Sequence, residues 1–117
     1  MRIAEALARA EANSPFLSRL IERNAELVPL IEEGDFNGAL AASLARTDAA
    51  VGTMLRKQKQ GVALVTAIAD LSGAWDLTRV THVLSDFADH ALDIAIATAI
   101  AERVPDAESR GFSVIAL

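Results

Sequence analysis

The chain has 117 residues, 52% of them hydrophobic, no cysteine, and 16 acidic against 11 basic side chains. This composition is typical of one small acidic domain, and it excludes a disulfide framework and a thiolate metal site. All of the excess negative charge lies in residues 61–117, which carry 3 basic and 8 acidic residues, whereas residues 1–60 carry 8 of each. Because a net-negative chain lacks the basic surface that neutralises phosphates, we expect a protein partner, and neither nucleic acid nor a membrane.

The N-terminal segment, residues 1–11, is rich in alanine and predicts a short helix. Glu5 and Glu11 interrupt the apolar run that a signal peptide needs, so we expect a cytoplasmic protein. The uncharged run over residues 60–69 is about half of the roughly 20 residues that cross a bilayer, which predicts no membrane span.

The next segment, residues 13 to about 46, predicts two further helices separated by turn residues. Residues 13–15 supply a cap and a first-turn proline for the next helix, which Pro29 is expected to bend or split. Gly34 then marks a stop, and Asp35 caps a third helix that reaches about Arg46.

The second half of the sequence predicts two long helices, over about 48–72 and 76–103. The first ends at Gly73, and Asp76 caps the second, which stops before Pro105. A connection this short forces the two helices to lie antiparallel as a hairpin. The sequence therefore predicts an all-α fold, an antiparallel helical bundle built on this hairpin and followed by a short C-terminal β-strand.

The C-terminal residues 111–117 break the helical pattern. A glycine followed by a short, mostly apolar run predicts a buried β-strand. A single strand cannot satisfy its own backbone N–H and C=O groups, so it needs strands that residues 1–110 do not supply. Either it pairs with another molecule or the natural chain continues, and we favour continuation. The predicted organisation is a helical region over 1–110 and the first strand of a further domain at 111–117.

Charged side chains are expected to connect the two long helices. The first helix carries a polar line at helical spacing, formed by Arg56, Lys59 and Asp70. The second carries an acidic row, formed by Asp86, Asp89 and Asp93. Folding the hairpin about Ala74 and Trp75 brings three sets of charges level: Arg56 with Asp93, Lys59 with Asp89 or His90, and Asp70 with Arg79. We favour this structural ion pairing over the alternative that Arg56, Lys59 and Asp70 bind a substrate or partner.

The acidic row also admits a metal-binding interpretation. Carboxylates and the nearby His82 at helical spacing can converge on one ion, but an ion-paired or solvated face explains the same spacing, so we predict no metal site. We predict no catalytic residue either. Ser85 and His82 lack an oxyanion donor and an orienting carboxylate, and the chain has no glycine-rich phosphate loop.

Apolar residues surround the last helix over residues 91–101. Leu92, Ile96 and Ile100 fall on the side of the acidic row, where a two-layer bundle leaves them in water. A helix that is apolar all round is normally buried all round. We therefore expect cover from further chain or from a partner, and a homodimer of the chain on its own.

Several segments resemble one enzyme family in order and approximate spacing. They are residues 13–17, 55–59, 69–73, 80–89 and 111–117, which read NSPFL, LRKQK, ADLSG, VTHVLSDFAD and GFSVIAL. Together these segments resemble the N-terminal part of the glutamine synthetase adenylyltransferase/adenylyl-removing enzyme family, and the resemblance covers nearly the whole chain.

This resemblance implies a specific role for the predicted strand. In the family, the strand that corresponds to 112–117 leads into a glycine-rich loop and two carboxylates that hold Mg²⁺ in a nucleotidyltransferase domain. Those enzymes use ATP to attach AMP to a tyrosine of glutamine synthetase and remove it by phosphorolysis, which yields ADP, under control of a PII-type signal protein. The resemblance implies that this chain is a helical lead-in to that domain and transfers no catalytic residue to it.

Two functions therefore follow from the sequence. The favoured one is a fragment of this enzyme that is inactive alone, because the catalytic loop and carboxylates would lie beyond Leu117. The alternative is a free-standing helical interaction module that dimerises through its hairpin and terminal strand.

Overall fold

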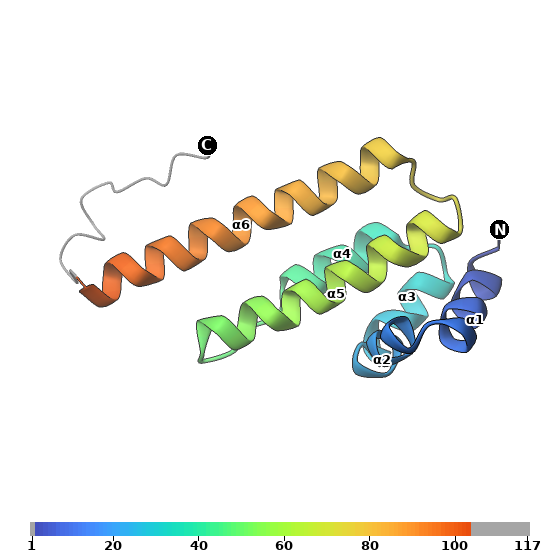
Figure 1. Ribbon diagram of the computed structural model, residues 1–117, viewed down its shortest axis with the longest axis horizontal. Helices are drawn as coiled ribbons and strands as arrows, with labels where there is room; N and C mark the ends of the chain where they lie inside the picture. Colours follow the sequence, from blue (N-terminus) through green and yellow to red (C-terminus); the bar gives the residue numbers. More distant parts are fainter. Residues whose placement is uncertain (1, 104–117) are drawn as a thin grey trace.

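Helices account for all of the regular secondary structure in residues 2–103, which are the residues that the computed structural model describes (Figure 1). In chain order they are α1 (Ile3–Asn13), α2 (Pro15–Arg23), the 3₁₀ turn η1 (Ala25–Leu27), α3 (Val28–Glu32), α4 (Phe36–Leu44), α5 (Val51–Leu71) and α6 (Leu77–Arg103). The predicted all-α class is confirmed for this part of the chain. The strand predicted over 111–117 lies outside the described residues.

Short polar side chains begin three of the helices. The Ser14 hydroxyl accepts the Leu17 amide at 3.2 Å at the start of α2. Asp35 accepts the amide three residues on at 2.9 Å, and Asp76 does the same at 2.8 Å. Gly34, with a φ of 82°, follows α3. Each cap satisfies an amide that the first helical turn leaves without a partner, so these helix starts follow from local sequence.

Pro29 does not kink a continuous helix. Instead α2 ends at Arg23, a break follows at Asn24, and Pro29 is the second residue of α3. Proline has no amide to donate and its ring clashes with the carbonyl four residues earlier, so it fits only the first turn of a helix. The sequence correctly predicts a split here, and the break falls five residues before the proline.

Helix α5 forms the centre of the packed part. Leu64, Val65 and Ile68 are fully buried, and they belong to one apolar cluster with residues of α1 to α4. Figure 1 shows α6 running antiparallel to α5, and α4 and the short N-terminal helices pack against other sides of α5. At the turn between α5 and α6, the ring of Trp75 lies 5.9 Å from that of Phe36 and so joins the turn to α4.

Helix α6 is packed far less completely than α5. Val83 is the one buried residue described in it, and the outer leucines are exposed by 77% at Leu77, 48% at Leu84 and 53% at Leu92. In the described part of the chain, residues 91–101 are half-buried or exposed, so the burial on all sides that the apolar pattern suggests is not seen there. Among the described residues, no helix combines the length and apolar character that crossing a membrane requires.

Gly61 allows α4 and α5 to approach closely. A Cβ atom at this position would lie 2.3 Å from the Ser43 hydroxyl oxygen and 2.9 Å from a guanidinium nitrogen of Arg46. Ser43 is fully buried and donates to the Ala39 carbonyl, so it has little freedom to move away. The contact therefore requires glycine for reasons of space.

Gly61→Ala is expected to destabilise the fold by roughly 1–3 kcal/mol, because the added methyl overpacks the α4–α5 contact. Urea unfolding followed by circular dichroism measures this change. The matched control is Gly52→Ala near the start of the same helix, where an added Cβ meets nothing within 4 Å. It should leave stability unchanged or raise it by up to about 1 kcal/mol. Equal effects of the two substitutions would contradict the steric account.

Asp48 fixes the entry into α5. Its carboxylate accepts the Ala50 amide at 3.0 Å and the Lys57 ammonium at 2.9 Å, and these two interactions, the amide first, lower the pKa of Asp48. Because the folded-state pKa is lowered, the stabilisation is present above the unfolded-state pKa and is lost as the pH falls through the folded-state value.

A carboxyl NMR titration should therefore place the pKa of Asp48 below that of an ordinary aspartate. Lys57→Gln is expected to return it only part of the way, because the Ala50 amide remains as the larger cause. Lys59→Gln is the control and should leave this pKa in place. A complete return to the ordinary value in Lys57→Gln would show that the amide contributes nothing.

Candidate functional site

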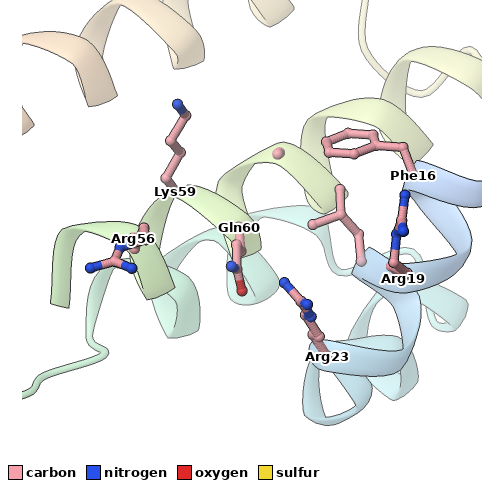
Figure 2. A pocket seen from close by; sticks show the side chains of 8 residues that line it. Phe16, Arg19, Arg23, Arg56, Lys59 and Gln60 are labelled. Carbon is pink, nitrogen blue, oxygen red and sulfur yellow. The ribbon is translucent and has the colours of Figure 1, made fainter. Parts of the chain in front are cut away.

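A groove with a volume of about 440 Å³ lies between α2 and α5 (Figure 2). One side of α2 and one side of α5 form its walls, and these two helices are far apart in the sequence. The lining residues are Phe16, Arg19, Leu20 and Arg23 from α2, and Arg56, Lys59, Gln60 and Ala63 from α5. The helical repeat explains this grouping, because residues three or four apart share one side of a helix.

Four of the lining side chains are basic and none is acidic. Among residues 2–103, the ion pairs of the structure involve other cations, namely Arg9, Arg46 and Lys57. The floor is apolar, with Leu20 buried and Ala63 half-buried, and the Phe16 ring at one end is 62% exposed. The groove thus combines positive charge with a small apolar surface, a combination suited to an anionic ligand that also has an apolar side.

The basic side chains spread along the groove (Figure 2). Arg19 stands beside Phe16, and Arg23 extends toward the Gln60 amide on the opposite helix. Arg56 and Lys59 leave α5 in different directions and do not converge with the two α2 arginines on one point. The positive charge is therefore distributed over the length of the groove.

The structure brings together two of the three residues predicted to bind a substrate or partner. Arg56 and Lys59 both line the groove. Asp70 is exposed near the C-terminal end of α5, about 16 Å along the helix axis from Lys59 by the 1.5 Å rise per residue. Asp70 therefore does not belong to this site.

The charge pairs predicted between α5 and α6 do not form in the described part of the structure. Within residues 2–103, no ion pair links these helices, and the acidic row of Asp86, Asp89 and Asp93 is exposed. Arg79 packs 5.0 Å from the centre of the Trp75 ring and donates to the Asn37 side chain at 2.8 Å.

The side of α5 that faces α6 explains why these pairs do not form. Gln58 makes a polar contact with α6, with its side-chain oxygen 3.0 Å from His90 Nε2. Lys59, the next residue, is turned by about 100° around the helix. It lines the groove, and within residues 2–103 it pairs with no carboxylate of α6. In the part of the chain that the structure describes, a neutral amide with a histidine thus stands where charge pairs were predicted.

Comparison with known proteins gives a family for this helical unit. A family model described as glutamate-ammonia ligase adenylyltransferase matches residues 2–117. The chain belongs to the glutamate-ammonia ligase adenylyltransferase family. No solved structure matches the chain.

The curated relatives carry the name bifunctional glutamine synthetase adenylyltransferase/adenylyl-removing enzyme. The protein from Caulobacter vibrioides is 40% identical over 106 residues, which cover 84% of this chain and 11% of the relative. Those from Bradyrhizobium sp. and Xanthobacter autotrophicus are 32% and 35% identical, and each match covers 72% of this chain and 9% of the relative. The chain thus spans about a tenth of the length of these adenylyltransferase-family relatives.

In this member of the adenylyltransferase family, a partly buried arginine links the two helices that form the groove. Arg46, whose side chain is only 15% exposed, donates to the Asn24 side chain at 2.6 Å and to the Lys57 carbonyl at 2.7 Å, and it pairs with Glu26. Asn24 is fully buried and donates to the Leu20 carbonyl at 2.7 Å. Arg46 therefore ties the end of α2 to α5, the two helices that form the groove.

Gln58 extends this polar network toward α4 and α6. Its amide nitrogen donates to the carbonyls of Leu44 and Arg46 at 3.2 and 3.0 Å, and its oxygen contacts His90. Gln58 is 3% exposed, so these partners replace the water that its amide loses on burial.

Arg19, Arg23 and Arg46 are not among the site residues that the sequence predicts. Arg19 and Arg23 are four residues apart beside the apolar Leu20, and that helical spacing was an available signal. No sequence pattern marks Arg46, because its partners come from distant parts of the chain. In residues 2–103, no three histidine, aspartate or glutamate side chains are placed to hold a metal ion.

Arg46→Met is expected to lower the free energy of unfolding by about 2–4 kcal/mol, because it leaves the buried Asn24 oxygen without a donor and removes charge-assisted bonds. Chemical denaturation provides the measurement. The control is Glu26→Gln, which alters the same cluster at a side chain that is 63% exposed and should cost less than about 1 kcal/mol. A loss in Glu26→Gln as large as in Arg46→Met would place the stabilisation in the exposed ion pair.

Proposed function

We propose that this chain is a non-catalytic helical segment of an enzyme that attaches AMP to glutamine synthetase and removes it again. The observation that carries the proposal is the family match over residues 2–117 together with the small share of each relative, about a tenth, that the chain covers. The names of the relatives supply the substrate, glutamine synthetase, and the two opposing activities.

The chemistry of the described residues supports a non-catalytic role. Adenylyl transfer needs groups that hold phosphates and their metal ions and stabilise developing charge. In residues 2–103 the carboxylates do not gather into a metal-binding set, and the cations of the groove do not converge on one phosphate. We therefore assign the Mg²⁺ and the ATP or ADP of the parent enzyme to its remaining nine-tenths, and we extend the proposal to control by a PII-type signal protein acting on the whole enzyme.

Helix α6 supplies a surface for packing against that remainder. Leu77, Leu84 and Leu92 lie on one side of the helix at about 100° per residue, and all three are exposed. A stripe of this kind on the surface marks a contact that burial would stabilise. We propose that the rest of the polypeptide covers it, and that self-association of the chain through α6 replaces this contact when the chain is alone.

The purified 117-residue chain is expected to transfer no AMP from ATP to glutamine synthetase and to release none from the adenylylated form in phosphate buffer. Radiolabelled AMP on glutamine synthetase is the readout, and the full-length Caulobacter relative is the positive control. Mg²⁺-dependent turnover by the pure chain would overturn the non-catalytic assignment.

The packing proposal has its own measurement on the same chain. Light scattering after size exclusion should show self-association at high concentration, and Leu84→Glu with Leu92→Glu should remove it. The control pair, Ala4→Glu with Ala8→Glu on exposed positions of α1, should leave it unchanged. A monomer at every concentration would show that the exposed α6 stripe does not drive association.

A further inference from the structure

We propose that the groove between α2 and α5 binds an acidic, amphipathic helix of a protein partner. The groove is defined by the eight lining residues given above, and the inference is independent of the proposed enzymatic parent.

The charge of the groove requires an anionic occupant. Arg19, Arg23, Arg56 and Lys59 all line it, no acidic side chain does, and within the described range none of these four forms an ion pair. This is notable in a chain whose net charge is −5. Like charges gathered on a small surface repel one another, and a partner of opposite sign removes that repulsion and directs the encounter.

The spacing of the cations matches a helix. Arg19 and Arg23 are four residues apart and so about 6 Å apart along α2, while Arg56 and Lys59 are three apart and about 4.5 Å apart along α5. Acidic residues three or four apart on a bound helix repeat at the same distances. Arg19 and Arg23 can thus pair with one acidic row of such a helix, while Arg56 and Lys59, which leave α5 in different directions, offer two separate positive charges on the other wall.

The floor of the groove accommodates the apolar stripe of such a helix. Leu20 and Ala63 add apolar surface to the groove, and Phe16 is 62% exposed. An exposed aromatic ring beside arginines is a common anchor for an apolar side chain of a partner. Because of this apolar surface, we expect the ligand to have an apolar side in addition to its negative charge.

Two other anionic ligands fit the groove less well. A single phosphate group needs cations that converge on it, whereas Figure 2 shows Arg56 and Lys59 directed away from Arg19 and Arg23. A nucleic acid strand needs a continuous basic surface and stacking platforms, but Phe16 is the one aromatic residue of the groove. An acidic helix meets both the distributed charge and the apolar floor.

A fluorescein-labelled peptide of 18 residues, with a leucine stripe flanked on both sides by glutamates, is the probe. Anisotropy titration should show binding that weakens as salt rises, because exposed charges are screened. Arg23→Gln with Arg56→Gln should weaken it by at least about tenfold, since two charged contacts of the groove are lost. Phe16→Ala should weaken it by at least about threefold at every salt concentration, because its contribution is apolar.

The matched control is Arg2→Gln with Arg103→Gln, which removes the same net charge from exposed positions outside the groove. Binding by this variant should stay within about twofold of the unmodified chain. A second control peptide carries glutamine in place of every glutamate and should bind at least about tenfold more weakly. Circular dichroism of each variant verifies that the helices are retained.

Several outcomes would overturn the proposal. The first is absence of binding by the acidic peptide, and the second is an equal loss of affinity in the groove variant and in the control variant. Tighter binding of the glutamine peptide would assign recognition to apolar contact alone. Pyrophosphate or a single-stranded oligonucleotide that binds more tightly than the acidic peptide would assign the groove to a different class of ligand.

Discussion

The close contact of α4 with α5 at Gly61 is the constraint on which the rest of the structure depends. The absence of a side chain at Gly61 lets the buried Ser43 lie directly against α5. This places the segment after α4 close enough to α5 for Arg46 to reach the Lys57 carbonyl. Because the contact is steric, it fixes the separation of the two helices more sharply than apolar burial alone, which favours proximity without setting an exact distance.

Arg46 connects this contact to the groove between α2 and α5. The same guanidinium binds Asn24 at the end of α2 and the backbone of α5, so both walls of the groove are held by one partly buried side chain. Glu26 pairs with Arg46 and is therefore already engaged by a cation outside the groove lining. Within residues 2–103 none of the four cations of the groove forms an ion pair, which leaves them available to a carboxylate of a partner.

Sequence reasoning succeeded where structure is local and failed where it depends on helix rotation. The caps at Ser14, Asp35 and Asp76 act on amides three residues away, so a short window of sequence contains all of the relevant chemistry. The predicted charge ladder assumed that Lys59 faces α6, but the packed face of α5 passes through Gln58. Moving one residue along a helix turns the side chain by about 100° around the helix axis. Which side of α5 is left for α6 is decided only by the packing of α1 to α4.

The two unpartnered surfaces differ in chemistry, and the difference indicates different kinds of contact. Burial of the leucine stripe of α6 would stabilise the protein in proportion to the apolar area buried, and this stabilisation is insensitive to salt. Contacts that form once, during folding, are of this kind. The groove carries charges that water solvates well in the free state, so exchanging a partner there costs less and depends on ionic strength. A helical segment that packs into a larger enzyme through α6 would still present the groove, because α2 and the Arg56 side of α5 face away from α6. Permanent packing and reversible recognition can therefore coexist on this helical unit without competing for the same residues.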